Sequence, residues 1–174
     1  MVLSTLRSDS KAIDMDERFL TEVKKERRSA ITVNRPREAA FKAWTDPLQL
    51  RAWWGPRGFD AREVTMQPRP GGSFRVDMED AEGRVFANRG EFREVDEPSR
   101  LVFTTTVIED MGGGPPLEAL NTVEFAEAGG GTEITWRWEA IEPAPNEMVA
   151  NALAGVELSN NDSLSRLAEF LSRS

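Results

Sequence analysis

The stretch from Trp44 to Phe59, WTDPLQLRAWWGPRGF, constrains the fold more than any other part of the chain. It holds three of the five tryptophans and is too apolar to be a surface connection. Asp46 is suited to cap a helix, and Pro47 is suited to the first helical position, where a missing N–H costs nothing. Gly55 and Pro56 then end the helical pattern. We expect two short helical turns that lie against a concave apolar surface.

Alternating apolar and polar residues predict antiparallel strands joined by tight turns. The expected strands cover residues 26–33, 59–67, 73–79, 85–95, 100–108, 121–126 and 132–140. The stretch 100–108 is apolar on both faces at its start, which is typical of a central strand. In the stretch 132–140, Trp136 and Trp138 are expected to point inward, while Arg137 and Glu139 point outward.

Helical patterns flank these strands. Residues 36–44 predict a short helix after the first strand, and residues 146–172 contain no proline and one glycine. Apolar residues in this last stretch recur near helical spacing, which predicts a long amphipathic helix. The order predicts an α+β fold, with a curved antiparallel sheet of about six or seven strands wrapped around the C-terminal helix. We expect residues 1–25 to form a partly ordered extension and residues 26–174 to form one domain.

The chain has no histidine, cysteine or tyrosine. This excludes Ser-His-Asp and Cys-His catalytic sets, disulfides, and zinc, iron or copper sites that use histidine or cysteine ligands. The acidic cluster at residues 77–82 is typical of a solvated hairpin tip, so we expect neither a metal site nor a cofactor. A base at neutral pH would have to be a carboxylate or a lysine with a strongly shifted pKa.

The charge of the chain limits its partners. The formal net charge is −8 and the pI is about 4.8, which argues against nucleic acid or an anionic membrane as the main partner. No apolar run reaches membrane-spanning length, so we expect no membrane insertion. The N-terminus lacks the pattern of an export signal, and we therefore expect a cytoplasmic protein.

A set of motifs spread along the chain resembles a known family. The motifs are Arg35-Pro36-Arg37-Glu38, Ala43-Trp44-Thr45-Asp46-Pro47, Leu50-Arg51-Ala52-Trp53-Trp54-Gly55-Pro56, Pro70-Gly71-Gly72-Ser73-Phe74-Arg75, Pro98-Ser99-Arg100-Leu101-Val102-Phe103-Thr104 and, in the final helix, Leu164, Arg166-Leu167 and Leu171. With them the chain resembles the helix-grip superfamily (START- and Bet v 1-like, SRPBCC), and within it the branch related to the Hsp90 ATPase activator. The resemblance covers about residues 26–172.

The final helix departs from that branch at one place. Relatives in the branch often carry a Gly-Trp pair shortly before the step that is Ser163-Leu164 here, whereas this chain has Ser159-Asn160. The change replaces a bulky aromatic ring by a small polar group. If Asn160 faces the interior, the resemblance implies a cavity that is larger and more polar than usual.

The resemblance implies a ligand cavity between the sheet and the C-terminal helix. Its expected lining is Trp54, Phe74, Met78, Phe86, Asn88, Phe103, Thr105, Val123, Phe125, Trp136, Trp138, Met148, Ala152, Val156, Asn160 and Leu164. For each aromatic residue, plain core packing is the competing interpretation. The inward amides need a partner, which can be a ligand, water or the backbone.

Three classes of function follow. The first is binding of a small hydrophobic molecule without chemistry, which we favour over enzymatic activity because no catalytic set is evident. The second is a cavity enzyme of the polyketide cyclase or dehydratase type, which would need an inward charged residue. The third is a role linked to Hsp90, by analogy with the activator. The resemblance is also compatible with a homodimer, although no stripe in the sequence indicates one.

Overall fold

The computed structural model describes residues 26–107, 118–141 and 146–174, with the side chains of residues 107 and 146–154 outside that description. Within these residues, seven strands form one antiparallel sheet in the order β1-β7-β6-β5-β4-β3-β2. The strands are β1 (Glu26–Val33), β2 (Asp60–Met66), β3 (Ser73–Glu79), β4 (Val85–Asp96), β5 (Arg100–Val107), β6 (Glu118–Ala128) and β7 (Gly131–Ala140). The helices are α2 (Arg37–Thr45), α3 (Pro47–Trp53) and α4 (Asn146–Arg173).

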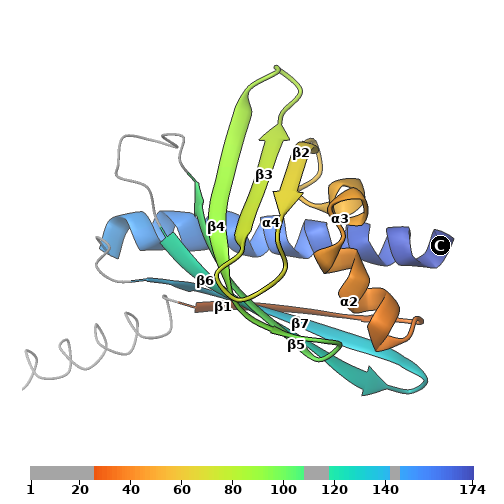
Figure 1. Ribbon diagram of the computed structural model, residues 1–174. Coiled ribbons are helices and arrows are strands. Elements are labelled where there is room, and N and C mark those ends of the chain that lie inside the picture. Colours follow the sequence, from red (N-terminus) through yellow and green to blue (C-terminus); the bar gives the residue numbers. More distant parts are fainter. Residues whose placement is uncertain (1–25, 108–117, 142–145) are drawn as a thin grey trace, which may run out of the picture.

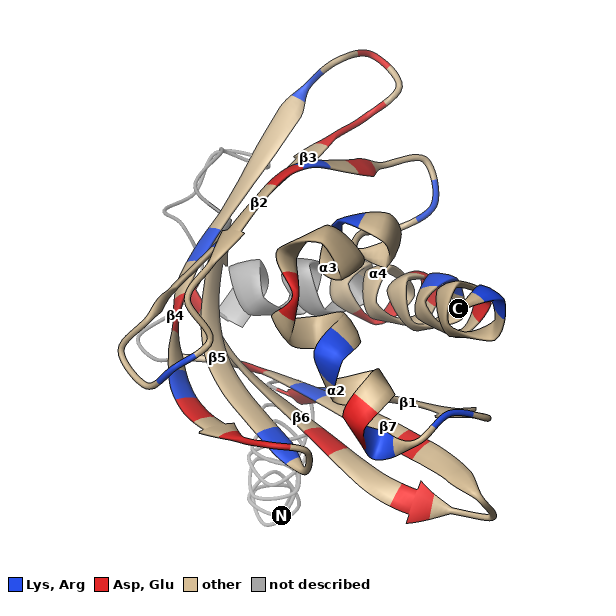
Figure 2. Cartoon of the chain, turned by 45° about the vertical axis from the view of Figure 1, so that its right-hand side comes forward, with Lys and Arg blue, Asp and Glu red and all other residues tan. Residues whose placement is uncertain are grey.

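The sheet curls around α4, as Figures 1 and 2 show, and α2 and α3 lie beside that helix on the concave side. This confirms the predicted α+β helix-grip fold. Part of the curvature comes from β4. A Cβ atom on Gly90 would collide with the carbonyl oxygen of Thr104, so only glycine allows β4 and β5 to approach this closely. The β4–β5 register also shifts between Phe92 and Glu94, and such bulges bend a strand.

The predicted elements agree closely with the observed ones. Asp46 caps α3 by accepting a hydrogen bond from the backbone N–H of Leu48 at 2.9 Å, and Pro47 occupies the first turn. The strand expected to be central, β5, is the middle strand of the sheet. The main difference is β6, which runs from Glu118 to Ala128 rather than over 121–126. Its extra residues alternate like the rest, but several are alanine or glutamate, which carry a weak strand signal.

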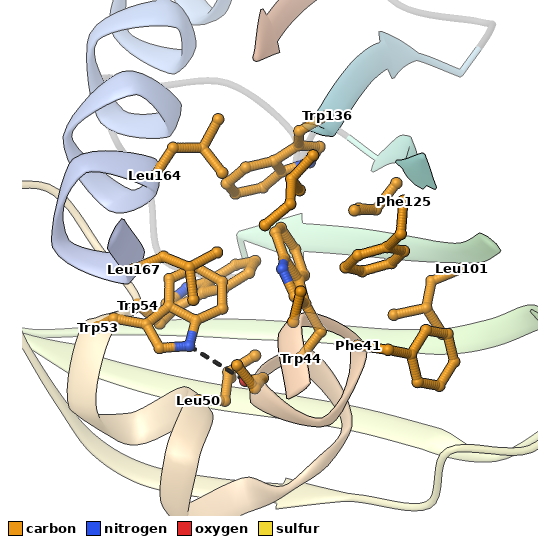
Figure 3. Packing of buried hydrophobic residues seen from close by; sticks show 14 of the residues in the cluster. Phe41, Trp44, Leu50, Trp53, Trp54, Leu101, Phe125, Trp136, Leu164 and Leu167 are labelled. Atoms are coloured by element: carbon orange, nitrogen blue, oxygen red, sulfur yellow. Dashed lines mark hydrogen bonds between the residues drawn. The ribbon is translucent and has the colours of Figure 1, made fainter. Parts of the chain in front are cut away.

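Trp44, a residue of α2, lies at the centre of an aromatic core to which both α2 and α3 contribute side chains (Figure 3). Its ring packs against Trp53 at 4.7 Å, Trp136 at 5.0 Å and Trp54 at 6.1 Å between centroids. The indole N–H of Trp53 donates to the carbonyl oxygen of Ala43 at 3.1 Å, which joins the two short helices. The Trp-rich segment therefore forms the core of one end of the molecule.

Helix α4 runs alongside β1 in the same direction. Arg27 Nε lies 3.3 Å from Glu157 Oε2, and Arg35 Nη1 donates to the carbonyl oxygen of Ser174 at 2.7 Å. Eight residues of extended chain and seventeen residues of helix each span about 26 Å, so the two contacts fix a parallel alignment.

Residues 1–25, where we expected an extension with a helical turn, lie outside the described residues. Among the helices that the structure describes, none is both long and apolar enough to cross a membrane.

Candidate functional site

The strand residues predicted to line a cavity all lie on the concave face of the sheet. Directly opposed residues of antiparallel strands share a face, and Met78 faces Phe86 while Val76 faces Asn88. The same rule places the remaining residues together through the β4–β5, β5–β6 and β6–β7 pairings. The inward set is Phe74, Met78, Phe86, Asn88, Phe103, Thr105, Val123, Phe125, Trp136 and Trp138.

One group of these residues forms solid core. The ring of Trp54 packs against Phe74 at 5.5 Å and against Trp136 at 5.2 Å between centroids. Phe74 and Phe103 lie 4.8 Å apart. Leu164 of α4 belongs to the same buried cluster. At this end of the interface the side chains contact one another, so core packing accounts for them and their role as ligand contacts remains a prediction.

Burial becomes looser toward the N-terminal half of α4. Along β3 the inward residues pass from buried Phe74 to half-buried Met78, and along β4 they pass from buried Phe92 to half-buried Phe86. On α4 the series runs from buried Leu164 to half-buried Val156. The inward residues of β3, β4 and α4 therefore all become more accessible toward the N-terminal half of α4. The side chains of Met148 and Ala152, which were predicted to face this region, lie outside the described residues.

Polar residues line the inner face between the solid core and this looser region. We call them the polar belt: Ser29 of β1, Asn88 of β4, Thr105 of β5, Asn121 of β6 and Asn160 of α4. All are at least nine-tenths buried, with exposed fractions between 1% for Asn121 and 8% for Thr105. Buried polar groups on an otherwise apolar face need partners.

Asn121 is the hydrogen-bonded centre of the belt. Its Nδ2 atom donates to Thr105 Oγ1 at 2.9 Å, and its Oδ1 atom accepts from the indole Nε1 of Trp136 at 2.9 Å. Nδ2 also lies 3.4 Å from the carbonyl oxygen of Phe103. The network holds the amide of Asn121 and the indole of Trp136 in fixed orientations.

Three other members of the belt have polar groups without partners among the described residues. The Ser29 hydroxyl oxygen is buried and makes no hydrogen bond there. Asn88 and Asn160 are residues that are each 6% exposed, and neither side-chain amide makes a hydrogen bond to another described residue. Such groups occur where water or a ligand completes the site.

The alignment of α4 with β1 places two of these residues at the same level. Ser29 lies two residues beyond Arg27, or about 6.6 Å along the strand. That distance equals about four helical residues beyond Glu157, which is within about one helical residue of Asn160. Asn160 also shares a helix face with Leu164 and Leu167, which are buried in the core.

Sequence reasoning missed three residues of this face. Asn121 was placed in a strand without a role, although its alternation with Val123 and Phe125 marks it as inward. Ser29 alternates with Ile31 and Val33 in the same way. Arg27 lies on the inner face of β1, where Glu157 of α4 neutralises it at 3.3 Å.

Two surface clefts lie outside the predicted interface. One, of about 180 Å³, lies between α3 and the end of α4, and its lining is Ala52, Arg57, Arg166, Glu169, Phe170 and Arg173. The other, of about 350 Å³, is lined by Arg57, Gly58, Phe59, Asp60, Asp80, Ala81 and Arg166. The second cleft adjoins the looser region, because the ring of Phe59 packs against that of Phe86 at 5.6 Å.

Arg166 has a structural role between these clefts. Its Nη1 atom donates to the carbonyl oxygens of Gly55 at 3.0 Å and Phe59 at 2.9 Å. These bonds fasten the segment after α3 to α4. Arg166 is therefore engaged by the backbone rather than open to a ligand.

A buried carboxylate with a shifted pKa does occur, but on the opposite face of the sheet. Asp77 of β3 accepts from Arg75 Nη2 at 2.9 Å and from Arg89 Nη1 at 2.7 Å. Burial alone raises the pKa of Asp77, but the hydrogen bonds from the two arginines outweigh burial and hold the pKa below its ordinary value. Asp77 alternates with the inward residues Val76 and Met78, so it points away from the belt.

Solved structures share this fold. Protein NE0264 from Nitrosomonas europaea is 24% identical, with a TM-score of 0.70 over 86% of this chain and 96% of that one. Protein CV1439 from Chromobacterium violaceum is 26% identical, with a TM-score of 0.69 over 83% of this chain and 95% of that one. DynU16, a putative protein in the dynemicin biosynthetic locus, is 24% identical, with a TM-score of 0.63 over 85% of this chain and 47% of that one.

A search of curated proteins found no match to the chain. A family model does match, and its description is "Activator of Hsp90 ATPase homolog 1-like protein". The match covers residues 34–172, which include every element from α2 to β7 and all of α4 except its last residue. This agrees with the branch that the tryptophan motifs indicated. The chain therefore belongs to the family of Activator of Hsp90 ATPase homolog 1-like proteins.

Proposed function

We propose that the protein binds a small apolar or amphipathic molecule between the concave face of the sheet and the N-terminal half of α4. The observation that carries this proposal is the polar belt, where the Ser29 hydroxyl oxygen is buried without a partner among the described residues, and where Asn88 and Asn160, each 6% exposed, make no side-chain hydrogen bond to them. A bound molecule would supply those partners. Water is the competing explanation.

The surroundings of the belt support the same function. Ligand sites are mostly apolar and contain a few placed polar groups. Met78, Phe86 and Val156 line the inner face beyond the belt, and all three are only half-buried. Such side chains leave apolar surface for a ligand to cover, and each square ångström covered contributes about 25 cal/mol.

Filling the site tests the proposal. We would titrate the purified protein with the neutral fluorescent probe N-phenyl-1-naphthylamine and follow its emission. Asn160→Trp places a large ring beside the belt, whereas Leu158→Trp makes a matched change at a position that is 65% exposed. We expect wild type and Leu158→Trp to bind the probe and Asn160→Trp to lose at least about tenfold in affinity.

Circular dichroism would establish that both variants fold. Equal probe affinity in all three proteins would place the site elsewhere, and absence of binding to wild type would contradict the proposal. Native mass spectrometry of the protein purified from its source adds a direct test, because a reproducible added mass identifies the class of cargo.

A cavity enzyme is a less favoured candidate for the same site. One structural neighbour, DynU16, is a putative protein in the dynemicin biosynthetic locus, but that likeness extends to the fold alone. Acid–base chemistry needs a charged group on the inner face. Arg27 is the charged residue that β1 brings there, and it is paired with Glu157. Turnover of a bound ligand, detected by mass spectrometry after incubation, would favour this candidate.

The family match favours a further candidate, an Hsp90-linked role. A pull-down with Hsp90 as bait tests it, and absence of association would remove it. A homodimer also stays a prediction, which light scattering on the purified protein would check.

A further inference from the structure

The polar belt offers hydrogen-bond donors and acceptors together. The amides of Asn88 and Asn160 each present N–H and carbonyl groups, and the Ser29 hydroxyl can donate and accept. The hydroxyl oxygen of Thr105 already accepts a hydrogen bond from Asn121 Nδ2 at 2.9 Å, so the hydroxyl proton of Thr105 can be donated to a ligand. A single group that satisfies such a surface must both donate and accept.

The belt carries no formal charge. A carboxylate or ammonium group buried against neutral amides and hydroxyls would lack a counter-ion, which is strongly unfavourable. The neighbouring Arg27 lies 3.3 Å from Glu157 and is neutralised by it. The formal net charge of −8 adds a repulsive field for anions. The cost of burying an ion without a counter-ion favours a neutral ligand over either kind of ion, and the net charge disfavours anions further.

We propose that the ligand is a neutral, largely apolar alcohol or phenol. Its hydroxyl group lies on the polar belt, where it donates to one side-chain oxygen and accepts from an N–H or O–H group. Its carbon skeleton lies against Met78 and Phe86, which line the inner face beyond the belt, and against Trp138, which lies opposite Asn121 on the same face. An ether would only accept, and would leave the amide oxygens unpaired. This inference rests on the proposed function and adds the chemical class of the ligand.

Displacement of N-phenyl-1-naphthylamine by four matched probes tests the inference. The probes are 1-decanol, 1-methoxydecane, decanoate and decylammonium, which share a ten-carbon chain and differ in the polar end. We expect 1-decanol to displace the fluorescent probe from wild type at about one tenth of the concentration that each other compound needs. Tenfold corresponds to about 1.4 kcal/mol, close to one hydrogen bond.

Variants locate the source of the preference. Asn88→Leu removes the amide, and we expect the preference for 1-decanol to fall to about twofold while the fluorescent probe still binds. Thr105→Val should weaken the preference, whereas the control Thr106→Val, which changes the neighbouring residue on the outer face of β5, should keep it.

The possible results distinguish a failure of the neutral-hydroxyl inference from a failure of the proposed ligand binding. Equal displacement by all four probes, or better displacement by decanoate or decylammonium, would overturn the neutral-hydroxyl assignment while leaving ligand binding intact. A preference for 1-decanol that persists in Asn88→Leu and Thr105→Val would overturn the role of the belt. If the fluorescent probe does not bind wild type, both the proposed function and this inference fail.

Discussion

Replacing Asn121 by leucine tests how the polar belt is held together. The substitution keeps the approximate shape of the side chain but removes the acceptor of the indole N–H of Trp136, a residue that is 3% exposed. A buried donor left without a partner costs about 1–3 kcal/mol, and the lost bond to Thr105 adds about 1 kcal/mol. The apolar surface of leucine offsets part of this loss. We expect Asn121→Leu to lower the free energy of unfolding by about 2 kcal/mol.

The origin of that loss can be isolated by a double-mutant cycle with Trp136→Phe. Phenylalanine has no N–H to orphan, so Asn121→Leu should cost little in its background. We expect a coupling energy of about 1–2 kcal/mol between the two positions, because apolar replacement of both partners can be nearly neutral. The change in ring volume is common to both sides of the cycle and cancels.

Urea unfolding followed by far-ultraviolet circular dichroism would measure all four proteins. Asn161→Leu, at an exposed position of α4, is the matched control and should change stability by less than about 0.5 kcal/mol. In thermal unfolding, a loss of 2 kcal/mol corresponds to about 4–8 °C in a domain of this size. If Asn121→Leu costs the same with and without the indole, the orphaned donor is not the cause and the reasoning is wrong.

Three further predictions concern the rest of the fold. Arg166→Met should lower the free energy of unfolding by about 2–4 kcal/mol, because the carbonyl oxygens of residues 54–59 lose their charged donor, and an unchanged thermal midpoint would contradict this. Asp46→Ala should cost about 1 kcal/mol through the lost cap of α3, measured by urea unfolding, while Asp46→Asn should cost less. The depressed pKa of Asp77 stabilises the fold above the unfolded-state pKa of about 3.9, and this contribution is lost as pH falls through the folded-state pKa. The stability of Asp77→Asn should therefore approach that of wild type below about pH 4, whereas parallel pH curves would refute the assignment.

Much of the fold could be predicted because its signals are local. The cap at Asp46 and the proline after it set the start of α3, whatever the rest of the chain does. Alternation of apolar and polar residues gave the faces of β3, β4 and β7, because successive side chains on a strand point to opposite sides. Composition was informative as well, since the absence of histidine and cysteine removes whole classes of chemistry.

Alternation assigns a face but says nothing about what covers it. Phe74 and Phe86 have the same inward pattern, yet Trp54 covers Phe74 while Phe86 is only half-buried. That difference depends on where α3 and α4 lie over the sheet, which is set by contacts between residues far apart in the chain. The partners of Asn121 were equally hidden, because Thr105 and Trp136 belong to other strands. The sequence by itself determined the strands, the helices and the inward faces, and only the tertiary structure decided which inward residues are core and which meet at the polar belt, because burial and hydrogen bonding there depend on neighbours from other elements.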